Sequence, residues 1–309
     1  MERTVLLFCH AVSLNGTAWN PIIRRVASSP LLQRFPCEIV TFDYRYHGAN
    51  HDFSDLGKIS FLNGDKKAPR ADHDLRLWTS WGAEELEIIV GRLRADDDKL
   101  SRKTRIIGIG HSLGASSLIK LEILRPGLLD GIIAFEPVCN CEFMPVDANA
   151  LITMMVANTL RKQDKWNTWD EVLQHFSSAK HYSRWDKEAI AAFLESGVIQ
   201  APDGSYRLAC PPSQEAAAYC HTMLRFTEED HQRMRCKVFY EHGEHTKLFS
   251  PEITLDITKS VRDKVIVAPA VKDAGHLITV ENPAACAERI LADLREFPAF
   301  QSNRVTSRM

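Results

Sequence analysis

IGIGHSLGASSL, residues 107–118, carries the pattern Gly-x-Ser-x-Gly centred on Ser112. KTRIIGIG (103–110) predicts a buried strand before it, and SLGASSLIKLEIL (112–124) predicts a helix after it. A serine at such a junction is held on a strained turn with its hydroxyl exposed. Glycines two residues before and after the serine let the neighbouring backbone approach closely. A glycine-rich turn without chemistry is the alternative, but this context favours Ser112 as a nucleophile.

Short β-rich runs alternate with longer amphipathic runs along most of the chain. Strands are predicted at 4–10, 37–44, 129–137, 236–243 and 263–270, and helices at 18–35, 79–96 and 282–297. Because the strands are apolar on both faces, we predict an α/β fold with a mainly parallel sheet between helices. Residues 138–235 are instead helical and rich in aromatics and methionine. They predict a helical cap inserted into a core of residues 1–137 and 236–309, the alternative being a structural excursion with its own small core.

A serine nucleophile needs a base, and His276 is the candidate. It lies late in the chain in DAGHLITVENP (273–283), before the closing helix, as the order serine–acid–histidine requires. The acid is harder to assign, because Thr246 occupies the usual position of an aspartate three residues after Gly243. Glu241 and Glu244 are nearby, but either would need a different loop path.

Glu136 is the favoured acid, with Glu244 as the second candidate. It ends the strand that follows the Ser112 helix, so in a parallel sheet it emerges at the carboxyl edge beside the serine. A carboxylate at an apolar strand end is costly unless it is paired, and His276 would supply the partner. The alternative is a carboxylate at a solvated strand end.

When a serine attacks a carbonyl carbon, the carbonyl oxygen becomes negative, and two backbone N–H groups are needed to stabilise this oxyanion. Leu113 follows the nucleophile and would supply one; Ala11 or Val12, in the loop after the first strand, would supply the other. Apolar side chains of the predicted cap are candidates to cover an acyl group, although each could instead belong to the core of the cap. They are Met154, Met155, Trp166, Trp169 and Trp185.

The bulk composition excludes several other classes of protein. A net charge of −2 gives no reason to expect a nucleic-acid partner, and no apolar run is long enough to span a bilayer. The eight cysteines are scattered without a Cys-x-x-Cys motif, so we expect reduced thiols and no metal site. No cofactor is expected.

Four segments resemble the α/β-hydrolase superfamily: HAVSLNGTAW (10–19), FDYRYHG (42–48), GHSLGA (110–115) and GHLITVENP (275–283). Ala11 stands where that superfamily usually has glycine. The stretch 185–219 is similar to α/β-hydrolases of fungal toxin and polyketide pathways, some of which are peroxisomal acyl-CoA hydrolases. That resemblance implies an acid after the strand following the nucleophile, which matches Glu136. The superfamily normally begins with further strands that appear absent here, so either the sheet is shortened, with an edge that can pair in a homodimer, or the gene model lost its front.

Ser307-Arg308-Met309 resembles the Ser-Lys-Leu address that a peroxisomal import receptor reads. Together with the resemblance, it predicts a peroxisomal serine hydrolase that cleaves an acyl-CoA-like thioester through Ser112, His276 and Glu136; without the address, the cytoplasm is expected. Three alternatives remain open. They are a lactone or carboxylic ester hydrolase acting on a polyketide-like metabolite, an acyltransferase to a non-water acceptor, and a non-catalytic ligand-binding member of the fold.

Overall fold

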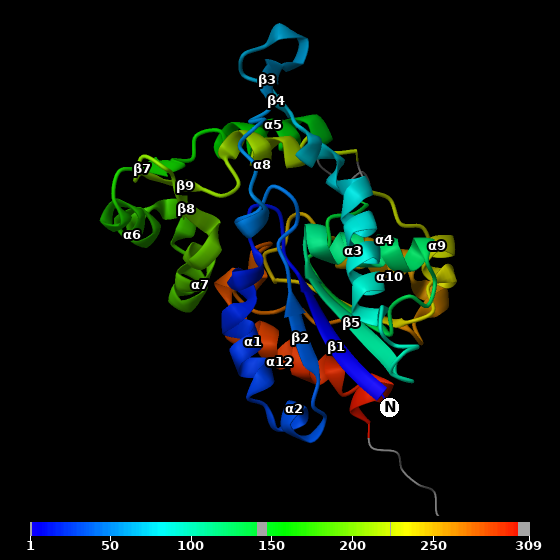
Figure 1. Cartoon of the computed structure of the whole chain (residues 1–309). Coiled ribbons are helices and arrows are strands. Elements are labelled where there is room, and N and C mark those ends of the chain that lie inside the picture. The colour runs from blue at the N-terminus through cyan, green and yellow to red at the C-terminus, as the bar shows by residue number, and fades with distance from the viewer. Residues whose placement is uncertain (1, 141–146, 223, 302–309) are drawn as a thin grey trace, which may run out of the picture.

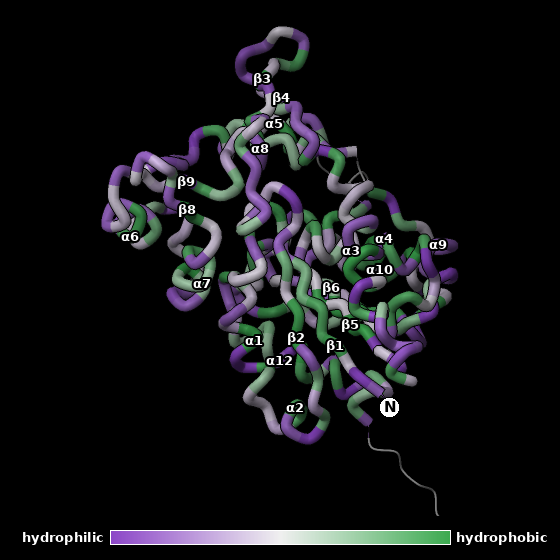
Figure 2. The backbone as a smooth tube through the Cα atoms, in the orientation of Figure 1, coloured by the Kyte–Doolittle hydropathy of each residue, from purple (hydrophilic) through white to green (hydrophobic). Residues whose placement is uncertain are grey.

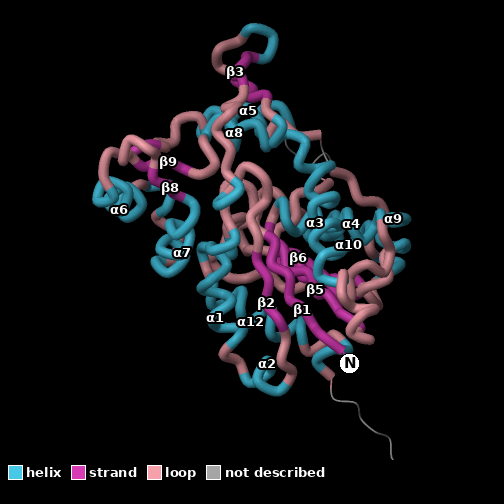
Figure 3. The backbone as a smooth tube through the Cα atoms, in the orientation of Figure 1, coloured by secondary structure: helices cyan, strands magenta, loops and turns pink. Residues whose placement is uncertain are grey.

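A six-stranded parallel sheet forms the centre of the molecule (Figure 1, Figure 3). The computed structural model describes residues 2–140, 147–222 and 224–301. The strand order is β11-β10-β6-β5-β1-β2. The strands are β1 (Glu2–Cys9), β2 (Glu38–Thr41), β5 (Lys103–His111), β6 (Gly131–Phe135), β10 (Lys237–Glu241) and β11 (Val265–Val267). The predicted α/β fold with a mainly parallel sheet is confirmed.

Helices cover both faces of this sheet. α1 (Asn20–Ala27) and α12 (Pro283–Leu294) lie on one face, and α3 (Trp78–Arg94) and α4 (Leu113–Leu124) lie on the other (Figure 1). Neighbouring residues of β1 contribute to opposite cores: Leu6 packs on the first side and Leu7 on the second, both fully buried. The central strands therefore carry the continuous hydrophobic stretches visible in Figure 2.

Two parts of the core differ from the predicted elements. The helix predicted over 18–35 is split, because Ser29 accepts a hydrogen bond from the Leu32 N–H and starts a second helix, α2 (Pro30–Arg34). The loop before α3 contains a hairpin of β3 (Lys58–Phe61) and β4 (Pro69–Asp72), which projects at the top of Figure 1. Within the described residues, no helix is long and apolar enough to cross a membrane.

The segment between β6 and β10 lies outside the central sheet (Figure 1). It contains a three-stranded antiparallel sheet, ordered β7-β9-β8, that the sequence analysis did not predict. Its elements are α5 (Ala148–Thr159), β7 (Lys165–Trp166), α6 (Trp169–Ser178), α7 (Lys187–Gly197), β8 (Val198–Gln200), β9 (Tyr206–Leu208), α8 (Pro212–Ala218) and α9 (Glu228–Arg233). After β10, the chain forms α10 (Pro251–Ile257), β11, α11 (Ile278–Glu281) and α12.

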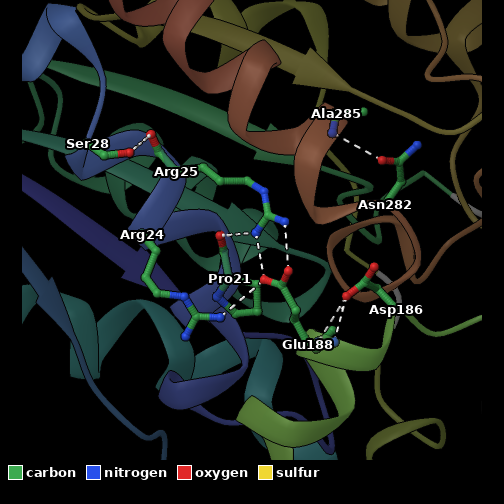
Figure 4. A network of polar contacts seen from close by, with 9 residues as sticks. Pro21, Arg24, Arg25, Ser28, Asp186, Glu188, Asn282 and Ala285 are labelled. Atoms are coloured by element: carbon green, nitrogen blue, oxygen red, sulfur yellow. Dashed lines mark hydrogen bonds and ion pairs between the residues drawn. The ribbon is translucent and has the colours of Figure 1, made fainter.

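Helix α7 contacts the core at its first turn and again farther along the helix. At its first turn, Glu188 forms ion pairs with Arg24 at 3.2 Å and Arg25 at 2.9 Å, both on α1 (Figure 4). Farther along the helix, the Phe193 carbonyl accepts a hydrogen bond of 2.9 Å from Asn15 Nδ2, in the loop after β1. The exposed ion pairs contribute little individually, but the buried Asn15 contact links α7 directly to the loop that carries Ala11 and Val12.

We predict that Gly114→Ala destabilises the protein by about 1–3 kcal/mol or more, because a well-packed site has no room for an added methyl group. A Cβ at this position would lie 2.2 Å from the Cys9 carbonyl oxygen, where α4 crosses β1. Gly91→Ala is the matched control: it lies exposed on α3 with nothing within 4 Å of an added Cβ. We expect that control to gain up to about 1 kcal/mol in helix propensity. Equal melting temperatures for the two variants would contradict the close contact.

Candidate active site

Ser112 sits between the last residue of β5 and the first residue of α4. Its backbone has φ +51° and ψ −111°. A positive φ is uncommon outside glycine, and such strain persists only where the surroundings enforce it. The turn is enforced by close packing at Gly110, where an added Cβ would lie 2.5 Å from the Ala115 nitrogen. The serine side chain therefore projects from a rigid, strained junction.

His276 lies in the loop between β11 and α11, with Nε2 3.1 Å from Ser112 Oγ. His111 positions this loop: its Nε2 donates to the His276 carbonyl oxygen at 2.7 Å, and its Nδ1 accepts from the Thr279 hydroxyl at 3.0 Å. Burial, followed by the nearby His276, lowers the pKa of His111 to about 3. His111 is therefore a neutral structural link between the serine turn and the histidine loop.

Glu136 follows β6 directly and is fully buried, with φ +49°. Its Oε2 lies 3.2 Å from His276 Nδ1 and accepts a 2.6 Å hydrogen bond from the Thr246 hydroxyl. Its Oε1 accepts from the Gly243 N–H at 2.8 Å. The carboxylate thus has three donors, one of them the imidazole, and the structure brings Glu136, His276 and Ser112 into one hydrogen-bonded row.

The other two acidic candidates lie elsewhere. Both carboxylate oxygens of Glu241 bind Arg289, at 2.8 and 3.1 Å. Glu244 is exposed and accepts from the Asp273 N–H at 3.1 Å. Glu244 also groups with His245 and Asp273, whose ligand atoms lie within 4.8 Å of one another, but all three are exposed, which is common without a metal.

The loop after β1 is held by two buried histidines. His10 donates from Nδ1 to the Ala11 carbonyl at 2.7 Å and accepts the Tyr44 N–H at Nε2, 2.9 Å. His47 Nε2 accepts the Ser13 N–H at 3.0 Å. Burial lowers the pKa of His10 to about 4 and that of His47 to about 3, so both are neutral and able to accept.

The role of His47 was not predicted, although FDYRYHG was noted for its resemblance to the superfamily. The histidine before Gly48 was the available signal. Its hydrogen bond to Ser13 helps to fix the backbone of the loop containing Ala11 and Val12.

The candidate oxyanion donors lie around the serine. Ala11 and Val12 line the same cavity as Ser112 and His276. Leu113 is the first residue of α4, and the first N–H groups of a helix have no acceptor within it. Its N–H therefore needs an acceptor from outside the helix.

A mainly apolar cavity of about 140 Å³ lies above Ser112 and His276. Of the predicted cap residues, Met155 and Trp185 line it. The other three do not. Met154 is 54% exposed, and Trp169 is 37% exposed against the Tyr206 ring. Trp166 is buried in the same hydrophobic cluster as Trp185 but does not line the cavity. The spacing of these residues in the sequence did not distinguish side chains that line the cavity from those that do not.

The alpha/beta hydrolase family model matches residues 6–289. The chain therefore belongs to the α/β-hydrolase family and is a hydrolase. The abhydrolase domain-containing protein AKT2 of Alternaria alternata is 21% identical over 221 residues, which cover 61% of this chain and 82% of the relative. This similarity fits the predicted resemblance to fungal members.

Two solved structures share the fold. The peroxisomal α/β-hydrolase Lpx1 of Saccharomyces cerevisiae superimposes with a TM-score of 0.70 at 16% identity, covering 100% of this chain and 81% of that one. E-2-(acetamidomethylene)succinate hydrolase has a TM-score of 0.65 at 18% identity, covering 95% and 92%.

We predict that the buried neutral histidines make the fold sensitive to mild acid. The pKa of His47 in the folded protein, about 3, lies below its ordinary value of 6.5. Its contribution is therefore fully present above pH 6.5 and is lost progressively as the pH falls from that value to about 3, because the unfolded chain binds the proton first. Below that pH, His47→Asn should reduce the slope of unfolding free energy against pH by about 1.4 kcal/mol per pH unit, the effect of one proton.

Urea denaturation between pH 7 and pH 5 measures this slope. Asparagine keeps one acceptor and one donor, so the variant tests titration apart from hydrogen bonding. An unchanged slope would contradict a neutral His47.

Proposed function

We propose that this protein is a serine hydrolase that cleaves an acyl thioester of the acyl-CoA type, with Ser112, His276 and Glu136 as its catalytic triad. The observation that carries the proposal is the row of contacts at the cavity floor. Ser112 Oγ lies 3.1 Å from His276 Nε2, and His276 Nδ1 lies 3.2 Å from Glu136 Oε2. These are the contacts that a hydroxyl nucleophile, its general base and the acid that orients the base require.

In the first half of the reaction, the Ser112 hydroxyl oxygen attacks the thioester carbonyl carbon, and His276 Nε2 takes the hydroxyl proton. The buried Glu136 carboxylate stabilises the imidazolium without itself becoming protonated. The N–H of Leu113 and that of Ala11 or Val12 stabilise the negative oxygen. The carbon–sulfur bond then breaks, and the thiol leaves with the proton from His276.

In the second half, water attacks the acyl-serine carbonyl while His276 takes one of its protons. The tetrahedral intermediate collapses, the Ser112 oxygen recovers a proton, and the carboxylic acid is released. The apolar cavity suits the acyl part of the substrate, because burying hydrocarbon next to Met155 and Trp185 is favourable. Residues 138–235 act as a cap in this proposal, since they supply those two side chains.

The choice of a thioester has two supports. One is the resemblance of Ser307-Arg308-Met309 to a peroxisomal address, which lies outside the described residues. The other is the resemblance of residues 185–219 to fungal hydrolases, some of which act on acyl-CoA. Lpx1, which shares the fold, is itself named as peroxisomal. We propose peroxisomal localisation on the same grounds.

We predict that the protein releases thiol from acyl-CoA esters and that Ser112→Ala abolishes this release, because the variant lacks the nucleophile. A thiol-reactive dye measures the product across a panel of acyl chains. Labelling by a fluorophosphonate, measured by intact mass, is the control for a reactive serine. Labelling without thiol release would indicate that the substrate is a lactone or an oxygen ester. Absence of labelling in the folded wild type would contradict a serine hydrolase.

We also predict that Glu136→Gln lowers kcat/KM by about 10³ or more, because an amide neither holds the imidazole in the correct tautomer nor stabilises its charge. Glu244→Gln is the matched control, since Glu244 is exposed and contacts Asp273 instead. We expect that control to keep its activity. Initial rates at saturating and limiting substrate give both constants. An active Glu136→Gln with an inactive Glu244→Gln would reverse the assignment of the acid.

A further inference from the structure

A buried ion pair lies in the wall of the substrate cavity, apart from the Ser112 row. Lys162 Nζ is 2.6 Å from Glu215 Oε1, and the two side chains are 16% and 2% exposed. The Tyr219 hydroxyl donates to the same Glu215 oxygen at 2.9 Å. All three residues line the cavity. None of them contacts Ser112, His276 or Glu136 among the described hydrogen bonds.

Two elements distant in sequence bring these groups together. Lys162 follows α5, whereas Glu215 lies on α8 and Tyr219 directly follows it; α5 and α8 lie side by side above the central sheet (Figure 1). Leu151 and Ile152 of α5 supply apolar lining here, and His181, also in the lining, lies within electrostatic range of both Lys162 and Glu215. The ion pair, with its neighbours Tyr219 and His181, therefore forms a small polar patch in a mainly apolar cavity wall.

Packing alone does not explain why this ion pair lies in a mainly apolar wall. Removing two charges from water costs more free energy than their attraction returns unless the remaining donors and acceptors are also used, and apolar replacements are often as stable. An ammonium group has three donors. In the described part of the chain, Glu215 is the acceptor found for the Lys162 side chain. Lys162 therefore has donor capacity left for a bound molecule.

The net charge of the ion pair limits which chemical groups it can bind. Lys162 and Glu215 together are neutral, so a second carboxylate would meet the negative Glu215 as well as the positive Lys162. A ketone oxygen could accept from Lys162 but could give nothing to Glu215. A hydroxyl group can accept from Lys162 and donate to Glu215 at once. It is the functional group that uses both members of the pair.

We propose that Lys162, Glu215 and Tyr219 form a subsite that binds a hydroxyl group on an otherwise apolar acyl chain, so that the enzyme prefers hydroxyacyl substrates. The inference rests on the proposed function, because acyl transfer at Ser112 defines which end of the substrate lies at the cavity floor. Lys162 and Glu215 act here on binding and specificity, and Ser112, His276 and Glu136 carry the chemistry.

The test compares octanoyl thioester with a series in which one hydroxyl group is moved along the chain carbon by carbon. We expect one position to raise kcat/KM by about tenfold or more over the unsubstituted chain, because the site's polar groups are left unpaired without it. Lys162→Met, which keeps the length of the side chain, should bring that ratio close to one. Lys165→Met, on an exposed side chain of β7 in the same segment, is the matched control and should keep the ratio.

Two further measurements separate the possible failures. The Kd values of the hydroxylated and plain thioesters for Ser112→Ala report the subsite without turnover. The double variant Lys162→Met/Glu215→Gln removes both charges, and it serves if the single variant leaves Glu215 unpaired and unfolds. The inference is overturned if no hydroxyl position is favoured in kcat/KM or in Kd, or if the folded Lys162 variants keep the preference. It is also overturned if a ketone analogue gains as much as the alcohol, because Glu215 would then have no role.

Fluorophosphonate labelling of Ser112 and hydrolysis of the plain thioester report the proposed function separately. If both occur without a hydroxyl preference, the subsite fails while the hydrolase stands. If neither occurs but Ser112→Ala binds the hydroxylated chain more tightly, the subsite stands and the catalytic proposal fails.

Discussion

The fully buried carboxylate of Glu136 constrains the whole carboxyl edge of the sheet. An unpaired charge there would be prohibitively costly, so several elements must supply hydrogen-bond donors at the same place. The loop after β10 supplies the Gly243 N–H and the Thr246 hydroxyl, and the loop after β11 supplies His276. Satisfying this one group therefore fixes where β6, β10 and the histidine loop end relative to one another.

Neutral histidines hold the loops that form the site in place through hydrogen bonds. His111 links the serine turn to the His276 backbone, and His10 and His47 hold the loop after β1. Each uses one ring nitrogen to donate and the other to accept, which the charged form could not do. The same loop also contacts α7 through the hydrogen bond from Asn15 to the Phe193 carbonyl. The cavity wall and the cavity floor thus share one polar framework, and its dependence on uncharged imidazoles is a consequence of burial.

The sequence was most informative where one physical requirement dominates. Strands β1 and β5 are apolar on both faces, and a sheet covered on both sides is the arrangement that buries them. Glu136 was a candidate acid because parallel strands end at a common edge, and its side chain lies at that edge. The two- to four-residue strands β3, β4 and β7 to β9 were missed, because such short segments carry no clear alternation. The directions of Met154 and Trp166 depend on how α5 and β7 pack, which local sequence does not encode.

Thr246 stands where an aspartate was expected, and it donates to Glu136 from 2.6 Å. A carboxylate at 246 would be an acceptor facing an acceptor, and one of the two groups would have to hold a proton. The acid can therefore be supplied from the end of β6 or from the loop after β10, but the two positions are not independent. In evolutionary terms, positions 136 and 246 form a coupled pair. A change from an acid at 136 to an acid at 246 by single substitutions passes through one of two intermediates: a chain in which two carboxylates share one proton, or a chain with no acid at either position.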